Sequence, residues 1–282
     1  MGREDLKKLL GIIIMSDGTI SKSGKYNRSI KLETISYNKC QHTLFKKICR
    51  SIFNKNVSTI SYKTQGRVML CSRLYGKKQI EEMLKLSPTY QTTSGPNKSK
   101  EEFLQSTQPS ISFINEGKTD IKKLALRIWF DFDGSIIPSF KIKKKRDKKK
   151  DRVYDYYQIQ FECDINISET NPNLIKELLE LCKSLELRAI IKKDKRKWSG
   201  IDGIRISELN SVKKFIEMGG PVTIVKISSK SHRLKGTTKR KVCKGVARII
   251  RDVPLSYYFK DRKSAIGKKV YLDSLLSKYI KN

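Results

Sequence analysis

The chain has 282 residues, enough for two domains of ordinary size. It carries 61 Lys and Arg against 28 Asp and Glu, a net charge of +33 that attracts polyanions such as nucleic acids. No apolar run approaches the roughly 20 residues of a membrane-spanning helix, and no secretory signal follows Met1. We therefore expect an intracellular protein without membrane contact, bound to nucleic acid in the compartment that holds DNA.

Cysteine and histidine supply no recognisable metal-binding or nucleophilic motif. The six cysteines are scattered without the C-x-x-C pairs of zinc fingers. The two histidines stand outside the H-x-x-x-H and H-E-x-x-H frames. The chemistry of the protein is therefore expected to depend on carboxylates, lysines and a metal ion.

Apolar periodicity predicts five elements in the first part of the chain. Two of them are hairpins, which are expected to turn near residues 23–24 and at residues 65–66. The expected elements are a helix at 4–17, a strand pair at 19–36, a helix at 39–53, a hairpin at 57–74 and a short helix at 77–86.

The second part of the chain repeats this order after a stretch rich in Ser, Thr, Pro and Gly. The expected elements are a helix at 119–133, strands at 135–141 and 154–167, a helix at 172–185, strands at 187–194 and 203–207, and a helix at 209–218. We divide the chain into a first half (1–95), a linker (96–117), a second half (118–226) and a basic C-terminal extension (227–282).

Two strongly basic segments have no counterpart in the first half. Nine of the twelve residues at 141–152 are basic, and like-charge repulsion predicts a mobile loop that contacts phosphate. A nuclear-localisation signal is the alternative interpretation. The extension is expected to be a basic tail, in which Tyr257, Tyr258 and Phe259 form a small core contact or, alternatively, stack on DNA.

One short pattern is written twice, as LGIIIMSDGTI at 10–20 and LRIWFDFDGSI at 126–136. Each copy is an apolar run followed by Asp-Gly and a β-prone segment. Gly18 and Gly134 are expected to adopt the left-handed conformation of a helix C-cap. Asp17 and Asp133 oppose the helix macrodipole in a last turn, where basic residues are favoured. Two such acids in equivalent places indicate a pair of carboxylates needed for chemistry.

The segment 157–167 alternates apolar with polar residues, the pattern of a strand with one face on the core. Its polar residues are of the types that pair with base edges in the major groove. A solvated polar face is the alternative. The outward side chains are expected to be Gln158, Gln160, Glu162, Asp164 and Asn166 here, and Asn27, Ser29, Lys31 and Glu33 in the first half.

The two apolar helices that end in Asp-Gly, each opening an α-β-β-α-β-β-α half, resemble the LAGLIDADG homing endonucleases in their single-chain, two-repeat form. The resemblance covers residues 4–226. It implies an α+β fold of two pseudo-symmetric halves, with the two motif helices paired at the interface. It also implies two antiparallel sheets that form a DNA-binding saddle, and a monomer.

The resemblance also implies the residues of the active site. By position, Asp17 and Asp133 would bind Mg²⁺ or Mn²⁺ with the backbone carbonyls of Ser16 and Phe132. Lys39 and Lys226 would be catalytic cations beside them. Phe132 stands where the family has a small residue, so Gly11, Ser16 and Ala125 must make room for the helix pair, or the helix crossing is shifted.

The expected DNA-binding face combines the outward strand residues with basic residues of the hairpins. It comprises Lys25, Asn27, Ser29, Lys31, Glu33, Asn38, Arg67, Arg73, Lys143, Lys144, Lys145, Gln158, Gln160, Glu162, Asp164, Asn166 and Arg205.

These features predict a sequence-specific double-strand DNA endonuclease, associated with an intron or intein, that hydrolyses a long asymmetric target. The alternative is an intron maturase or DNA-binding regulator on the same scaffold with cleavage lost, for which intron RNA is a further partner. Both acids that precede the motif glycines are present, which favours the enzyme.

Overall fold

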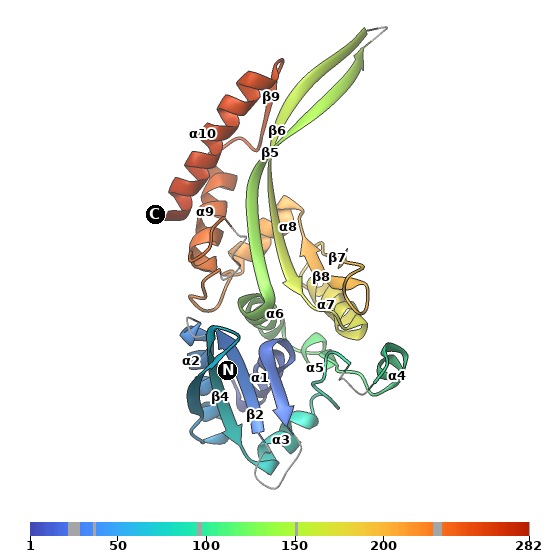
Figure 1. The fold of residues 1–282 in the computed structure, drawn as a ribbon, viewed down its shortest axis with the longest axis vertical. Helices are drawn as coiled ribbons and strands as arrows, with labels where there is room; N and C mark the ends of the chain where they lie inside the picture. The colour runs from blue at the N-terminus through green and yellow to red at the C-terminus, as the bar shows by residue number, and fades with distance from the viewer. Residues whose placement is uncertain (22–28, 36–37, 95–97, 150–151, 228–232, 282) are drawn as a thin grey trace.

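A computed structural model describes residues 1–21, 29–35, 38–94, 98–149, 152–227 and 233–281. The fold is α+β, as the sequence predicts, with two halves that each run α-β-β-α-β-β-α and each contain an antiparallel sheet (Figure 1). The halves meet where α1 (Arg3–Asp17) and α6 (Thr119–Asp133) pack against each other. No helix of the described residues is long and apolar enough to cross a membrane.

In the first half, the structure confirms the helices and strands that the sequence predicts. Its sheet has the strand order β1-β2-β4-β3, and the hairpin between β3 and β4 turns at Gln65 and Gly66, which both have positive φ. Such a pair of positive φ angles is what a two-residue hairpin turn requires. The turn predicted near residues 23–24 lies outside the described residues. After α1 the elements are β1 (Gly18–Ser21), β2 (Ser29–Ile35), α2 (Lys39–Phe53), β3 (Ser58–Thr64), β4 (Arg67–Tyr75) and α3 (Lys77–Leu84).

The segment between the halves contains two short helices, α4 (Lys100–Gln105) and α5 (Ser112–Asn115). Glu177 of α7 (Pro172–Ser184) fixes this segment to the second half, because its carboxylate accepts hydrogen bonds from the Ser110 hydroxyl (2.7 Å) and the Ile111 amide (2.5 Å).

The second half differs from the expectation in its first hairpin. The basic segment predicted as a mobile loop continues strand β5 (Gly134–Lys149), which pairs with β6 (Arg152–Ser168) as far as Lys149 and Arg152. Asp155 forms ion pairs with Lys144 (2.6 Å) and Arg146 (3.2 Å). This carboxylate on β6 offsets the repulsion among the basic residues of β5, which was the reason to expect a loop. The sheet has the order β5-β6-β8-β7 and is completed by β7 (Ile190–Lys193) and β8 (Ile201–Ile206), followed by α8 (Leu209–Glu217).

The C-terminal extension is a folded part of the second half, not a basic tail. It forms α9 (Lys239–Asp252), β9 (Ser256–Phe259) and α10 (Arg262–Lys281), which lie along the long β5–β6 hairpin (Figure 1). An apolar stripe on α9, with Val242, Val246 and Ile249, is buried in the core together with Leu272 and Leu276 of α10. The many basic residues between the stripe positions conceal this amphipathic pattern in the sequence.

The two motif glycines are not left-handed caps. Gly18 and Gly134 have φ of −101° and −92° and extended backbone, and each begins a strand directly. The reason for glycine is close approach. A Cβ on Gly18 would lie 2.6 Å from Ile14 Cα, and one on Gly134 would lie 2.4 Å from the Phe130 carbonyl oxygen.

Candidate metal and nucleic-acid site

Asp17 and Asp133 are the last residues of α1 and α6, the two helices that pack against each other, and both are half-buried and close enough to interact through their charges. Burial raises the pKa of Asp17 to about 6, and the charge of Lys239 opposes that rise. The pKa of Asp133 is raised well above its ordinary range, first by burial and then by the charges of Asp17 and Glu169. The two motif acids, one from each half, therefore form an electrostatically interacting pair.

Lys239 is the buried cation of this site, and the sequence interpretation missed it. The side chain is 5% exposed at the start of α9, and its ammonium donates to the carbonyl oxygens of Phe130 (2.7 Å) and Asp131 (2.8 Å). Burial lowers the pKa of Lys239 to about 8, whereas the charges of Asp131, Asp133 and Asp17 act to raise it. A positive charge thus lies within electrostatic reach of both motif acids.

Asp131 is a buried structural acid. Its carboxylate accepts a hydrogen bond from the Thr223 amide at 2.6 Å, and burial raises its pKa to about 6 against the opposing charge of Lys239. This contact fixes the segment after α8 against the last turn of α6. Asp131 precedes Asp133 by two residues on α6, so the two side chains project from different sides of the helix.

Gln41 connects the first half to the same helix end. The side chain is buried on α2, and its amide nitrogen donates to the carbonyl oxygen of Asp131 at 3.1 Å. Gln41 and Lys239 share a sequence signal, because each occupies a position on an otherwise apolar helix stripe. Gln41 precedes Phe45 by four residues, and Lys239 precedes Val242 and Cys243 by three and four.

Glu169 is a third carboxylate near Asp133. It is buried directly after β6 and accepts hydrogen bonds from the amides of Thr170 (2.6 Å) and Asn171 (2.7 Å). Burial raises its pKa to about 7 in spite of those two bonds. Its charge adds to the negative potential that Asp133 experiences.

The other residues predicted for the active site lie in less central positions. Lys39 is exposed at the first residue of α2, and Lys226 is exposed, with its backbone bridged to Thr238. Ser16 donates its hydroxyl to the carbonyl oxygens of Ile12 and Ile13 (both 3.1 Å), so that hydroxyl is occupied within α1.

The interface also deviates from the expected small-residue contact. Phe132 is buried, whereas the open side of Gly11 is filled by Phe113, whose Cζ would lie 2.9 Å from an added Cβ, and by Tyr90. Gly11 therefore makes room for residues of the segment between the halves, not for Phe132.

The donor set at the paired acids fits a divalent cation that prefers oxygen ligands. Mg²⁺ binds through one or two carboxylates and completes its shell with water and substrate oxygens. Among the described residues no three acidic, histidine or cysteine side chains form a metal cluster. Burial raises the pKa of both acids, and a bound cation would offset the cost of keeping them ionised.

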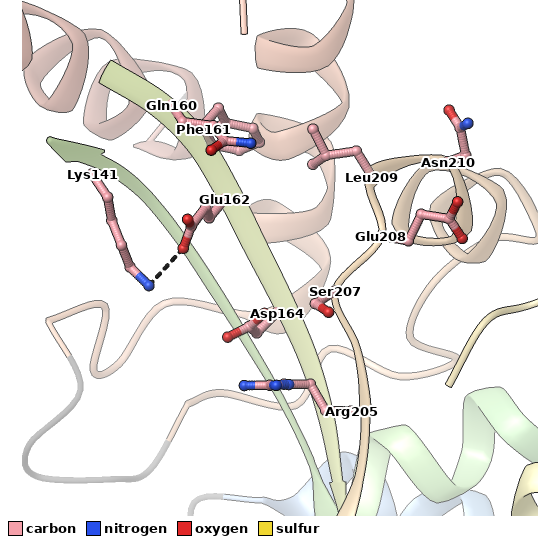
Figure 2. A pocket seen from close by; sticks show the side chains of 10 residues that line it. All are labelled: Lys141, Gln160, Phe161, Glu162, Asp164, Arg205, Ser207, Glu208, Leu209 and Asn210. Carbon is pink, nitrogen blue, oxygen red and sulfur yellow. Dashed lines mark ion pairs between the residues drawn. The ribbon is translucent and has the colours of Figure 1, made fainter. Parts of the chain in front are cut away.

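The outward face of the second sheet contains a hollow of about 510 Å³, lined by charged and amide side chains (Figure 2). Glu162 lies beside it and forms ion pairs of 2.6 Å with both Lys141 and Lys143. Asp164 and Arg205 extend over the same face, as predicted. Hydrogen-bond donors and acceptors thus alternate along this surface.

Several residues predicted for that face lie elsewhere. Ser29 and Asn166 are buried. Ser29 begins β2 opposite Ser21 and Tyr75, whereas Asn166 lies opposite Ser135, next to Gly134 at the end of α6. Lys144 points to the opposite face from Lys143 and Lys145, as neighbouring residues of a strand must. Lys25 and Asn27 lie outside the described residues.

In the first half, five further predicted residues have described positions on or near the sheet. Lys31 and Glu33 form an ion pair of 2.7 Å on the outward face, and Arg73 lies directly opposite Lys31 in the strand register. Arg67 is exposed at the start of β4, and Asn38 immediately precedes α2 with its side-chain oxygen Oδ1 buried.

Comparison with known proteins gives similarity of structure alone. No protein-family model matches the chain, and no curated protein matches its sequence. Mesophilic variants of the homing endonuclease I-DmoI are 13% identical, with 84% of this chain and 96% of that chain covered and a TM-score of 0.47. The homing endonuclease I-WcaI bound to its DNA recognition sequence is 14% identical (77% and 81% covered, TM-score 0.42). The N-terminal LAGLIDADG domain of DUF199/WhiA is 13% identical (77% and 83% covered, TM-score 0.42).

Proposed function

We propose that the chain is a divalent-metal-dependent, site-specific DNA endonuclease that cuts both strands of a long asymmetric duplex. The observation that carries the proposal is the pair of Asp17 and Asp133, one from each half, at the ends of helices packed side by side. The net charge of +33 supplies attraction to the phosphate backbone. Two near-equivalent acids suit the two antiparallel strands of a duplex.

Asp17 and Asp133 would hold the cation, Mg²⁺ or Mn²⁺, and the backbone carbonyls of Ser16 and Phe132 are the further ligands that we propose. When bound, the cation supplies positive charge to the scissile phosphate and to the attacking water. Lys239 stabilises the ionised form of both acids through its charge, since it acts against the rise in their pKa. Its hydrogen bonds to the last turn of α6 also hold Asp133 in place.

The two sheets would bind the duplex on both sides of the acids. The first half contributes Lys31, Glu33 and Arg73, and the second contributes Lys143, Gln158 and Gln160 with the residues around the hollow. The strands β5 and β6 have 16 and 17 residues, whereas β1 and β2 have four and seven. This inequality supports an asymmetric target and a protein that binds it as a monomer.

The test is a randomised duplex library incubated with the protein and Mg²⁺, followed by sequencing of the DNA ends. The double variant Asp17→Asn/Asp133→Asn removes the proposed ligands. Asp120→Asn is the matched control, because it neutralises a well-exposed acid at the other end of α6. Cleavage at one long site by the wild type and the control alone is the expected result.

Two other results would contradict the proposal. Cleavage that persists in the double variant would remove the two acids from the mechanism. A library that is bound selectively and stays intact would point to the DNA-binding regulator or intron maturase, and folded intron RNA would be the next ligand to test.

A further inference from the structure

The C-terminal extension supplies the fifth strand of the second sheet, β9, which pairs with β6. Strand β9 pairs antiparallel with β6 from Tyr157–Phe259 to Gln160–Ser256, and the Phe161 amide donates to the Leu255 carbonyl at 2.9 Å. Strand β8 pairs with the same edge of β6 at residues 165–168. Two segments far apart in the sequence therefore share one edge of β6, and the hollow of Figure 2 lies between them.

The alternation of side chains divides the aromatic triplet of β9 between two faces. Tyr257 packs against the core, with the Lys268 ammonium of α10 at 4.9 Å from its ring centroid, and Phe259 lies on the same face. Tyr258 is 65% exposed and lies directly opposite Gln158, so it shares the outward face with Ser256 and Gln158. The Tyr258 ring therefore lies outside the core.

The outward residues of β9 orient the amide of Gln158. The Gln158 Nε2 group donates to the Ser256 hydroxyl at 2.7 Å and to the Tyr258 hydroxyl at 3.4 Å. A glutamine amide has two hydrogens. Both are directed to β9, and this leaves the carbonyl Oε1 of Gln158 as the atom that faces a ligand as a hydrogen-bond acceptor.

The surroundings of this cluster match a nucleic-acid duplex. Lys143 lies opposite Gln158 on β5, and its ammonium donates to Gln160 Oε1 at 3.0 Å. The ring of Tyr156 lies with its centroid 5.9 Å from that of Tyr258, which adds a second aromatic group to the outward face. Cations that attract phosphate and a fixed hydrogen-bond acceptor on the same face are the groups that bind and read duplex DNA.

We propose that β9 and the adjoining part of β6 form a base-reading element far from the cleavage centre, in which Gln158 is the specificity-determining residue and Ser256 and Tyr258 position it. The proposal rests on the proposed function, since it assumes that the outward face of the sheet binds duplex DNA. Bound there, Gln158 Oε1 would accept from the amino group of adenine or cytosine in the major groove.

The strand geometry gives the position of the base that Gln158 would contact. Gly134 begins β5 beside Asp133, and Gln158 pairs with Lys143, nine residues further along that strand. At about 3.3 Å per residue this separation is roughly 30 Å, which corresponds to about nine base pairs of duplex. The contact therefore belongs to the outer part of one half-site.

The experiment selects bound duplexes from a randomised library with Ca²⁺ present, and compares the base preference at each position for the wild type and its variants. Gln158→Ala and Tyr258→Ala are expected to reduce the preference about nine base pairs from the centre of the site by roughly tenfold, and to leave the central positions unchanged. Ser256→Ala is expected to broaden the same preference. Tyr271→Ala is the matched control, because this tyrosine is 58% exposed on α10 and outside the sheet.

The outcomes separate this inference from the proposed function. If the wild type selects a long site and the Gln158 and Tyr258 variants retain every preference, the reading element is wrong while the endonuclease proposal stands. If the wild type selects no duplex, both fail. Loss of preference in Tyr271→Ala as well would assign the effect to general destabilisation and would also overturn the inference.

Discussion

The ammonium nitrogen of Lys239 lies 2.8 Å from the main-chain carbonyl oxygen of Asp131, in the last turn of α6. The carbonyls of a last turn have no partner within their own helix, and the negative end of the macrodipole lies there. Two acids, Asp131 and Asp133, add to that negative potential. Lys239 offsets both effects, and this explains how a helix can end in acids without a basic residue of its own.

Lys239→Met is expected to reduce cleavage by roughly 100-fold or more, since loss of a preorganised charge in an enclosed site has effects of that size. The pKa values of Asp17 and Asp133 should rise further, because the charge of Lys239 now opposes the rise in both. Single-turnover cleavage across a pH series measures both effects. DNA affinity should stay within a few fold.

Lys226→Met is the matched control for that substitution, since Lys226 is exposed and its backbone is bridged to Thr238, the residue before Lys239. It should retain cleavage within a few fold. A large loss in Lys226→Met with little loss in Lys239→Met would reverse the assignment of the two lysines.

Asp17→Asn is expected to stabilise the metal-free protein. The folded-state pKa of Asp17 is about 6, above its ordinary value of 3.8, so the folded state binds more protons than the unfolded state between those values. Stability from this group therefore falls as pH rises from about 4 to 6 and stays lower above that range. At pH 7.5 the asparagine should raise the free energy of unfolding by on the order of 1–3 kcal/mol.

Denaturant unfolding in EDTA measures this change, and Mg²⁺ supplies the complementary test. Added Mg²⁺ should stabilise the wild type and have little effect on the variant, because a ligand that binds only the folded state adds to its stability. Asp120→Asn should behave as the wild type in both solutions. A variant that is less stable than the wild type in EDTA would contradict the burial cost assigned to Asp17.

The affinity for Mg²⁺ is expected to fall below pH 6, by about tenfold per pH unit or more, because protons compete with the cation for Asp17 and Asp133. Above pH 8 Lys239 loses its positive charge, so it no longer stabilises the ionised forms of Asp17 and Asp133. Cleavage at low Mg²⁺ should therefore pass through a maximum between about pH 6 and 8. Lys239→Met should lack the alkaline decline, and an unchanged decline would assign it to another group.

The sequence predicted the two motif helices, the positions of Asp17 and Asp133 in their last turns, and nearly all of the other helices and strands. It could do so because helix and strand periods and the Asp-Gly repeat are local signals. It did not predict the conformation of Gly18 and Gly134, since a left-handed cap and a close backbone approach favour the same residue. Only the three-dimensional contact of Gly134 with the Phe130 carbonyl distinguishes them.

Contacts between distant segments account for the other differences. The charge run in β5 looks repulsive until Asp155 is placed opposite it. Lys239 looks like one of many surface lysines until the start of α9 is placed beside the last turn of α6. A polar residue on an apolar helix stripe was the available signal for both Lys239 and Gln41. The dense basic charge around the stripe of α9 conceals that signal in the sequence.

Asp131→Ala and Asp131→Asn should separate a structural acid from the proposed metal ligand two residues later. The alanine removes the acceptor for the half-buried Thr223 amide and is expected to destabilise the protein by about 1–3 kcal/mol. The asparagine keeps an acceptor oxygen and should retain both folding and Mg²⁺-dependent cleavage within about tenfold. Urea unfolding and cleavage of the selected site measure the two effects, and abolished cleavage in a stably folded Asp131→Asn would make Asp131 part of the metal site.

Glu162→Gln tests whether the outward face of the second sheet meets phosphate. Glu162 holds Lys141 and Lys143 in ion pairs of 2.6 Å, and these pairs hold the pKa of the Glu162 carboxyl below its ordinary value although burial acts to raise it. Loss of that charge frees two ammonium groups for DNA, so affinity for non-specific duplex should rise and log Kd should depend more steeply on log salt, by about one to two. Glu217→Gln on α8, which pairs with Lys213 away from this face, is the control. Equal salt slopes for the wild type and Glu162→Gln would mean that Lys141 and Lys143 do not reach phosphate, and the DNA-binding face would then have to be sought elsewhere on the molecule.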